Sequence, residues 1–86
     1  MLTLYIARCA DGTYYTGVAK NMDRRVRQHN GEVAGGAKYT RPRRPVRIVF
    51  ERVFEDDSEA RRMEYRVKKL SRPDKERLVN GQADLP

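Results

Sequence analysis

The first segment of the chain alternates between apolar and polar positions. Within segment 2–8, Leu2, Leu4 and Ile6 stand at every second position, which is the period of a β-strand with two distinct faces. Residues 14–18 have the composition of a second strand, and the dipeptide Asp11-Gly12 between the two favours a tight turn. We therefore predict a β-hairpin at the start of the chain.

Apolar spacing and capping residues predict three helices. The first follows Asn21, a suitable N-cap, and ends at Gly31. The second begins at a Ser58 cap and carries apolar residues three and four positions apart. The third begins with a capping box at Ser71, has a proline in its first turn and runs to about residue 79. The apolar stripe of the second helix comprises Ala60, Met63, Val67 and Leu70.

A third strand is expected over residues 46–54, after a long connection at residues 30–45 that is rich in glycine and proline. A connection of this length in a small domain is usually functional or disordered. The order β-β-α-β-α-α predicts an α+β fold with a three-stranded, mainly antiparallel sheet and helices packed on it. With 86 residues in total, we expect one domain over residues 1–80 and a short tail over residues 81–86.

The charge of the chain is concentrated in one segment. Nineteen Lys and Arg against twelve Asp and Glu give a net charge of +7. Residues 38–47 contain five of these cations and no acidic residue, which makes the segment a candidate phosphate-binding surface. The alternative is a solvated loop that aids solubility. The single Cys and single His exclude an internal disulfide and a zinc site made by this chain alone.

Composition also bounds where the protein acts. No apolar run approaches the roughly 20 residues of a membrane span, and the strand-like N-terminus predicts no signal peptide. We therefore expect a protein of the reducing cytoplasm that does not enter membranes. Its short helices have charged exposed faces that mark no dimer interface, so a monomer is expected.

Five polar side chains interrupt the patterns that otherwise favour packing. Two are strand tyrosines, two lie four residues apart on the first helix, and one is a carboxylate beside the apolar stripe of the second helix. They are Tyr5, Tyr15, Arg25, His29 and Glu64. Taken singly, each has an ordinary explanation: a strand tyrosine packs with its hydroxyl in water, a lone histidine is structural, and Glu64 pairs with Lys68.

In order and spacing, these residues resemble the GIY-YIG nuclease family. The two motifs that name the family stand here as Thr3-Leu4-Tyr5 and Tyr15-Thr16-Gly17, followed by the strings Asp23–Asn30 and Ala37–Arg41. The chain is most similar to the small stand-alone bacterial members, which consist of the nuclease module alone, and the resemblance covers residues 2–79. Many members also carry an asparagine in the last helix, for which Asn80 is the only candidate.

The resemblance implies a metal-dependent endonuclease that hydrolyses phosphodiester bonds in DNA. Glu64 would be the single metal-binding carboxylate, for Mg²⁺ or Mn²⁺, and Arg25 would neutralise the scissile phosphate. Tyr5, Tyr15 and His29 would hold the phosphate and handle the proton of the attacking water, with the general base open between Tyr15 and His29. This chemistry is sound, because cleavage needs an aligned nucleophile and a cation on the non-bridging oxygens.

The substrate follows from the same residues. Tyr39, and also Tyr14, offers a ring on which an unpaired base can stack, whereas no helix offers a recognition pattern for the major groove. One catalytic set per chain predicts a single-strand cut, with single-stranded or branched DNA preferred over intact duplex. The residues expected to contact nucleic acid are Lys38, Tyr39, Arg41, Arg43 and Arg44.

Two other functions remain open at this point. One is a nucleic-acid-binding module with the same fold and little or no catalysis. The other is a small basic protein that binds ribosomes or RNA through aromatic residues exposed on its sheet.

The length of the hairpin loop decides whether the tyrosines can share a site. A two-residue Asp11-Gly12 loop would place Tyr5 and Tyr15 on opposite faces of the sheet. A three-residue loop over residues 10–12, with Gly12 at positive φ, would pair Tyr5 with Gly17 and place both phenols on one face. A shared active site requires the second arrangement, so we predict the three-residue loop.

Overall fold

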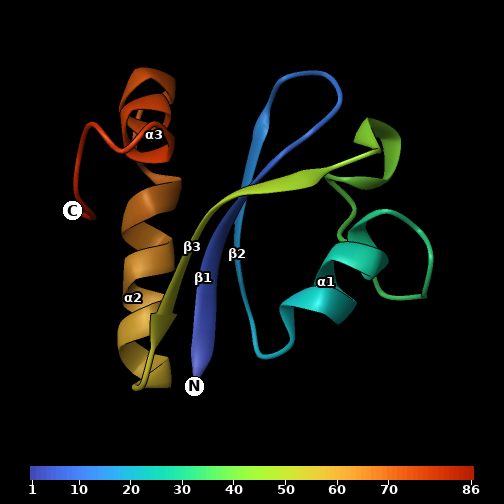
Figure 1. The fold of residues 1–86 in the computed structure, drawn as a ribbon, viewed down its shortest axis with the longest axis horizontal. Helices are drawn as coiled ribbons and strands as arrows, with labels where there is room; N and C mark the ends of the chain where they lie inside the picture. Colours follow the sequence, from blue (N-terminus) through green and yellow to red (C-terminus); the bar gives the residue numbers. More distant parts are fainter.

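The computed structural model describes residues 1–86 and confirms the α+β fold. Three antiparallel strands form one sheet in the order β2-β1-β3 (Figure 1). The elements follow the order β-β-α-β-α-α, with one 3₁₀ turn before the third strand. Their bounds are β1 Leu2–Arg8, β2 Tyr14–Ala19, α1 Met22–His29, the 3₁₀ turn Arg41–Arg43, β3 Arg47–Phe54, α2 Asp57–Lys68 and α3 Arg72–Val79.

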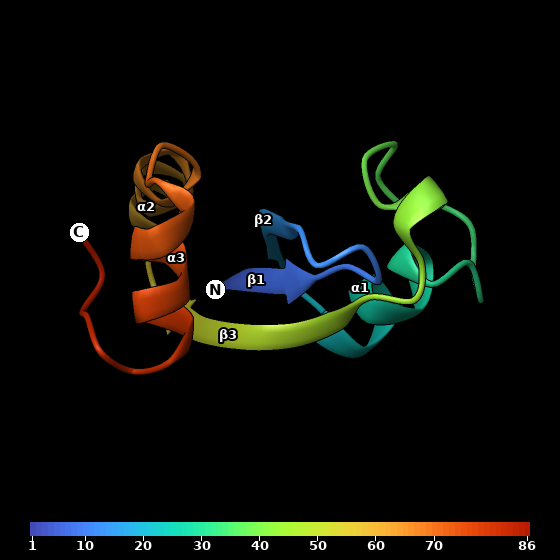
Figure 2. The ribbon, with the colours of Figure 1, turned by 90° about the horizontal axis from the view of Figure 1, so that it is seen from above.

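The helices cover both faces of the sheet. Figure 2 shows α1 and the connection after it on one side of the strands, and α2 with α3 on the other. Because side chains of a strand alternate between faces, the central strand β1 contributes to two buried clusters. The first contains Leu4, Ile6, Val67 and Leu78, and the second contains Tyr5, Ala7, Cys9 and Val46. None of the helices is long and apolar enough to cross a bilayer.

The hairpin has the three-residue loop that the sequence predicts. Cys9 N–H donates to the Thr13 carbonyl at 2.9 Å, and Gly12, at φ 85°, donates to the Cys9 carbonyl. Only glycine adopts this φ without strain. In the resulting register Tyr5 pairs with Gly17 and Ala7 pairs with Tyr15, so the two phenols lie on the same face.

Polar caps fix the ends of the helices. Asn21 accepts the N–H of Arg24 at the start of α1, as expected. Helix α1 ends in a Schellman motif, with Gly31 N–H bonded to the Gln28 carbonyl and φ 80°. The predicted cap of α2 is wrong by two residues: the cap is Asp56, whose carboxylate accepts the N–H of Ser58. An aspartate two residues earlier satisfies the same free N–H groups.

The connection between α1 and β3 is ordered by side-chain contacts with its two ends. Asn30 pairs with Val46 as a strand residue would, donating to its carbonyl at 3.0 Å and accepting its N–H at 2.7 Å. Arg44 Nε donates to the His29 carbonyl at 2.6 Å. These contacts hold the end of α1 beside the start of β3, which places the connection next to the tyrosine face of the sheet. At the other end of the chain, Leu85 of the tail packs against the first cluster.

Candidate active site

A buried hydrogen-bonded chain joins β1, α1 and the connection. The Tyr5 hydroxyl lies 2.7 Å from His29 Nε2, and His29 Nδ1 lies 2.9 Å from Thr40 Oγ1. The Thr40 hydroxyl donates a hydrogen bond to the Ala37 carbonyl, so its oxygen accepts a hydrogen bond from Nδ1–H. His29 Nε2 is therefore the acceptor for the Tyr5 hydroxyl. All three side chains are fully buried.

Electrostatics keep this histidine neutral. Burial, together with the nearby charges of Arg25 and Arg44, lowers the pKa of His29 to about 4. Burial likewise raises the pKa of the Tyr5 phenol, an effect that Arg25 partly offsets. At neutral pH the pair therefore consists of a phenol that donates to a neutral imidazole.

Arg25 is held at the edge of this chain by three contacts. Its Nε donates to the Tyr5 hydroxyl at 3.1 Å, and its Nη1 donates to Gln28 Oε1 and to the Gly35 carbonyl, both at 3.0 Å. No carboxylate pairs with it, and Nη2 makes no hydrogen bond. Burial lowers its pKa, but the Tyr5 and Tyr15 hydroxyls more than offset this and the net direction is upward. The group is a fixed cation with one free nitrogen.

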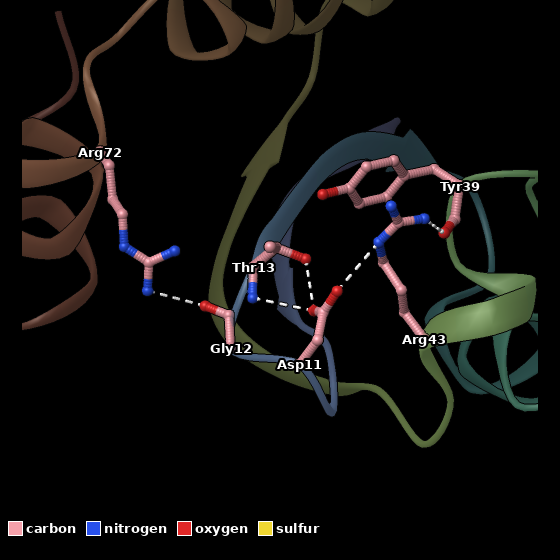
Figure 3. A network of polar contacts seen from close by, with 6 residues as sticks. All are labelled: Asp11, Gly12, Thr13, Tyr39, Arg43 and Arg72. Carbon is pink, nitrogen blue, oxygen red and sulfur yellow. Dashed lines mark hydrogen bonds and ion pairs between the residues drawn. The ribbon is translucent and has the colours of Figure 1, made fainter.

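Tyr15 is the partly exposed aromatic residue of the cluster. Its ring meets His29 edge-on, with centroids 5.2 Å apart, and stacks on Tyr39 at 6.2 Å. Tyr39 is in turn held by Arg43, whose guanidinium lies 3.9 Å from the ring centroid and donates to the Tyr39 carbonyl. Figure 3 shows Arg43 between Tyr39 and Asp11, with which it forms an ion pair at 3.0 Å. The hairpin turn thus braces the ring that packs on Tyr15.

Gly17 gives the tyrosines the space they occupy. A Cβ atom at this position would lie 2.7 Å from the Tyr5 hydroxyl oxygen and 3.1 Å from the Tyr15 ring. The first distance is too short for any real contact, so a side chain here would displace Tyr5. Gly17 pairs with Tyr5 in the hairpin, and the absence of a side chain there leaves room for the two tyrosine rings.

Glu64 lies apart from this cluster, on the helix that packs on the opposite side of the sheet. Its Oε2 forms an ion pair with Lys68 Nζ at 3.2 Å. This is the i,i+4 pair that the sequence offered as the ordinary explanation of Glu64. No hydrogen bond or ion pair joins it to the tyrosines or to Arg25. Its negative charge still adds to the upward shift in the pKa of Tyr5, behind the larger effect of burial. The carboxylate is thus near the site without touching it.

The cations of the connection divide into exposed and committed side chains. Lys38 and Arg41 are exposed and make no ion pair, so their assignment to nucleic acid stays a prediction. The guanidinium groups of Arg43 and Arg44 instead hold Tyr39 and the His29 carbonyl. Asn80 is exposed at the C-cap of α3 and makes no side-chain hydrogen bond. No sequence pattern indicated the contact of Thr40 with His29, because a threonine in an aperiodic connection resembles any other loop residue.

The residues present fit a weakly held divalent ion. No three His, Cys, Asp or Glu side chains gather in one group that could hold a metal ion. One carboxylate, Glu64, is mostly buried, with 19% of its side chain exposed. Its Oε1 has no partner, and its Oε2 contacts a half-exposed lysine that can swing away. A single carboxylate supplemented by water and substrate oxygens suits Mg²⁺.

Comparisons with known proteins identify close relatives. A UPF0213 protein of Desulfotalea psychrophila is 50% identical over 78 residues, which cover 91% of this chain and 70% of that protein. A UPF0213 protein of Halobacterium salinarum is 51% identical over 75 residues, covering 87% and 95% of the two chains. The matched segments cover 70% or more of each of these relatives.

Solved structures agree with the fold, and a family model matches most of the chain. The solution NMR structure of a UPF0213 protein from Bacillus halodurans matches with a TM-score of 0.61 at 46% identity, covering 95% of this chain and 86% of that one. A protein from E. faecalis matches with a TM-score of 0.62 at 37% identity, covering 92% and 82%. The model of the GIY-YIG catalytic domain matches residues 1–77. With Tyr5, Tyr15, Arg25 and His29 gathered on one face of this domain, the chain belongs to the GIY-YIG family of nucleases.

Proposed function

We propose that this protein is a divalent-metal-dependent endonuclease that cleaves DNA one strand at a time. Membership of a nuclease family supports hydrolysis of phosphodiester bonds. One observation carries the proposal for this chain: Arg25 is a fixed, half-buried cation without a carboxylate partner, near the partly buried Tyr15. Such a cation favours an anion, and a phosphodiester supplies one.

Arg25 would bind the scissile phosphate through Nη2. Its other donors are engaged by Tyr5, Gln28 and Gly35, so the orientation of the guanidinium is set before substrate arrives. A preorganised cation stabilises the charge that develops on the non-bridging oxygens without paying for reorientation.

Tyr15 would meet the attacking water, because Tyr5 and His29 are fully buried. The neutral imidazole accepts a hydrogen bond from the Tyr5 hydroxyl, and this leaves the Tyr5 oxygen free to accept a hydrogen bond from Arg25. Tyr5 and His29 are then positioning residues for Arg25, and of the two candidates for the general base we favour Tyr15. A phenol needs a nearby cation to act near neutral pH, and Arg25 lies beside it.

Glu64 would hold Mg²⁺ or Mn²⁺, exchanging its contact with Lys68 for the ion. When bound, such an ion polarises a phosphoryl oxygen and makes a coordinated water more acidic. The change Glu64→Gln keeps the shape of the side chain and removes the charge that attracts the ion.

Cleavage of an end-labelled oligonucleotide tests the reaction. We expect wild-type protein to cut with Mg²⁺ or Mn²⁺ and to stop when the ion is chelated, and Glu64→Gln to lose the activity by orders of magnitude while remaining folded. The matched control is Glu59→Gln, an exposed carboxylate on the same helix. Cutting by Glu64→Gln at the wild-type rate would overturn the proposed role of this carboxylate.

Single-stranded or branched DNA is the proposed substrate form. The chain supplies one Tyr15 and one Glu64, which is one catalytic set. Its longest helix has 12 residues and carries no recognition pattern for base edges in the major groove. The aromatic pair Tyr15–Tyr39 is not fully buried, and an unpaired base could stack on it. The test compares one strand alone, the strand annealed to its complement, and a flapped duplex at equal salt. Faster, blunt cutting of the intact duplex would refute the preference.

A second candidate is a DNA-binding module with little or no catalysis. The Glu64–Lys68 ion pair favours it, because that pair neutralises the one carboxylate near the site. This candidate is distinguished by wild-type protein that binds the oligonucleotide and fails to cut it with either ion.

A further inference from the structure

A second cationic surface lies beside the candidate active site, and it includes residues to which neither the sequence nor the proposed reaction assigns a binding role. An open cavity of about 260 Å³ lies between β2, the connection and the two C-terminal helices. We call it the lysine cavity. It is lined by Tyr14, Tyr15, Thr16, Tyr39, Lys68 and Lys75.

The charge of the lysine cavity is unbalanced. Lys75 is partly buried, its ammonium group forms no ion pair or hydrogen bond, and no carboxylate lines the cavity. Lys68 is paired only with Glu64. A partly buried cation without a counter-ion gains from any anion that completes its environment. The cavity therefore selects a negatively charged ligand.

The walls of the cavity add an aromatic surface and a preformed shape. The guanidinium groups of Arg8 and Arg72 lie 6.0 Å and 5.1 Å from the centroid of the Tyr14 ring. Arg72 is fixed there, because it donates to the Gly12 carbonyl at 2.7 Å and joins α3 to the hairpin turn (Figure 3). Thr16 is 4% exposed, and its buried Oγ1 has no hydrogen-bond partner. Polar groups left unpaired beside a cavity favour a polar ligand.

We propose that the lysine cavity binds the nucleotide next to the scissile phosphate. Lys75 and Lys68 contact its phosphate, and the Tyr14 ring contacts its base. Tyr15 lines this cavity and also stacks on Tyr39, so the strand crosses Tyr15 and reaches α3. This inference rests on the proposed function, since it names where the substrate strand runs on that same site.

Binding of a fluorescein-labelled oligothymidylate to Glu64→Gln protein tests the cavity without cleavage. We expect Lys75→Ala to weaken binding several-fold and to make the slope of log K against log salt shallower by about 0.7, the value for one phosphate of a single strand. The matched control is Lys69→Ala, which removes the same charge just after α2. Its ammonium lies over the Tyr65 ring at 4.3 Å, outside the cavity.

Two variants of Tyr14 test the aromatic contact. Tyr14→Phe keeps the ring and should bind as well as its parent, whereas Tyr14→Leu keeps apolar packing and should bind at least about five-fold more weakly. Thermal melting of both variants checks that they are folded. Equal binding by Tyr14→Phe and Tyr14→Leu would contradict the proposed contact between the base and the Tyr14 ring.

Different results would refute nucleotide binding in the lysine cavity and hydrolysis at the active site. If Lys75→Ala and Lys69→Ala lower affinity and salt slope equally while wild-type protein still cuts DNA, the cavity is not part of the substrate path. If the lysine variants differ as expected and wild-type protein does not cut with any divalent ion, the cavity stands and the proposed hydrolysis is wrong.

Discussion

Acid should destabilise this protein through its single histidine. Burial and the charges of Arg25 and Arg44 lower the pKa of His29 to about 4, against 6.5 for the free side chain. As pH falls, the unfolded chain therefore takes up a proton on this residue before the folded protein does. The contribution of neutral His29 is fully present above about pH 6.5 and is lost progressively as pH falls toward about 4.

The size of the effect follows from the two pKa values. The difference between 6.5 and about 4 corresponds to about 3 kcal/mol when pH lies below both values. Moving from about pH 7 to about pH 5 removes about 2 kcal/mol of this. For a domain of this size, such a loss lowers Tm by about 8–16 °C.

Urea and thermal unfolding at about pH 7 and about pH 5 measure this loss. The control is His29→Gln, whose amide can accept from Tyr5 and donate to Thr40 but does not titrate. We expect the variant to be less stable at neutral pH and nearly insensitive to this change of pH. His29 is the only histidine, so no other side chain titrates in this range at an ordinary pKa. Equal pH dependence in the two proteins would refute the assignment of a buried, neutral His29.

Three further outcomes follow from the contacts of the site. Gly17→Ala should displace the Tyr5 hydroxyl, cost about 1–3 kcal/mol in urea unfolding and lower the cleavage rate; unchanged stability would contradict the close approach. Arg25→Ala should lower the rate of cleavage far more than it lowers affinity, as single-turnover assays at saturating enzyme will show. Arg41→Ala should make the salt slope of binding shallower by about one or less, whereas Arg44→Ala should chiefly lower Tm because it releases the His29 carbonyl.

The sequence predicted the fold from signals that are local in the chain. The strand periods, the Asn21 cap and the glycine that ends α1 each depend on neighbouring residues, and all were found where expected. Even the three-residue hairpin loop was inferable, because only one register places Tyr5 and Tyr15 together. The start of α2 was misplaced because Asp56 and Ser58 are both good caps and lie two residues apart.

The site was predictable in part for the same reason. The hairpin register brings Tyr5 and Tyr15 together, and the helical spacing of Arg25 and His29 places both on the face of α1 that meets them. The contacts of Thr40, Arg43 and Arg44 depend on how the connection folds over α1 and the hairpin turn. Such contacts leave no periodic pattern in the sequence. The arginines of the connection were therefore all predicted alike, as phosphate ligands.

Net charge alone does not distinguish the cations that already have partners from those that lack one. Two arginines that lie over the Tyr39 and Tyr14 rings already have partners, because Arg43 pairs with Asp11 and Arg72 donates to the Gly12 carbonyl. Arg25 and Lys75 differ, because each is partly buried and lacks a carboxylate partner. Desolvation makes an unpaired cation costly in the free protein, so a phosphate that pairs with it gains more there than at an exposed lysine. Tyr15 lies next to both of them, packed on His29 beside Arg25 and lining the cavity of Lys75. A strand held by those two cations would pass directly over the tyrosine proposed to meet the attacking water.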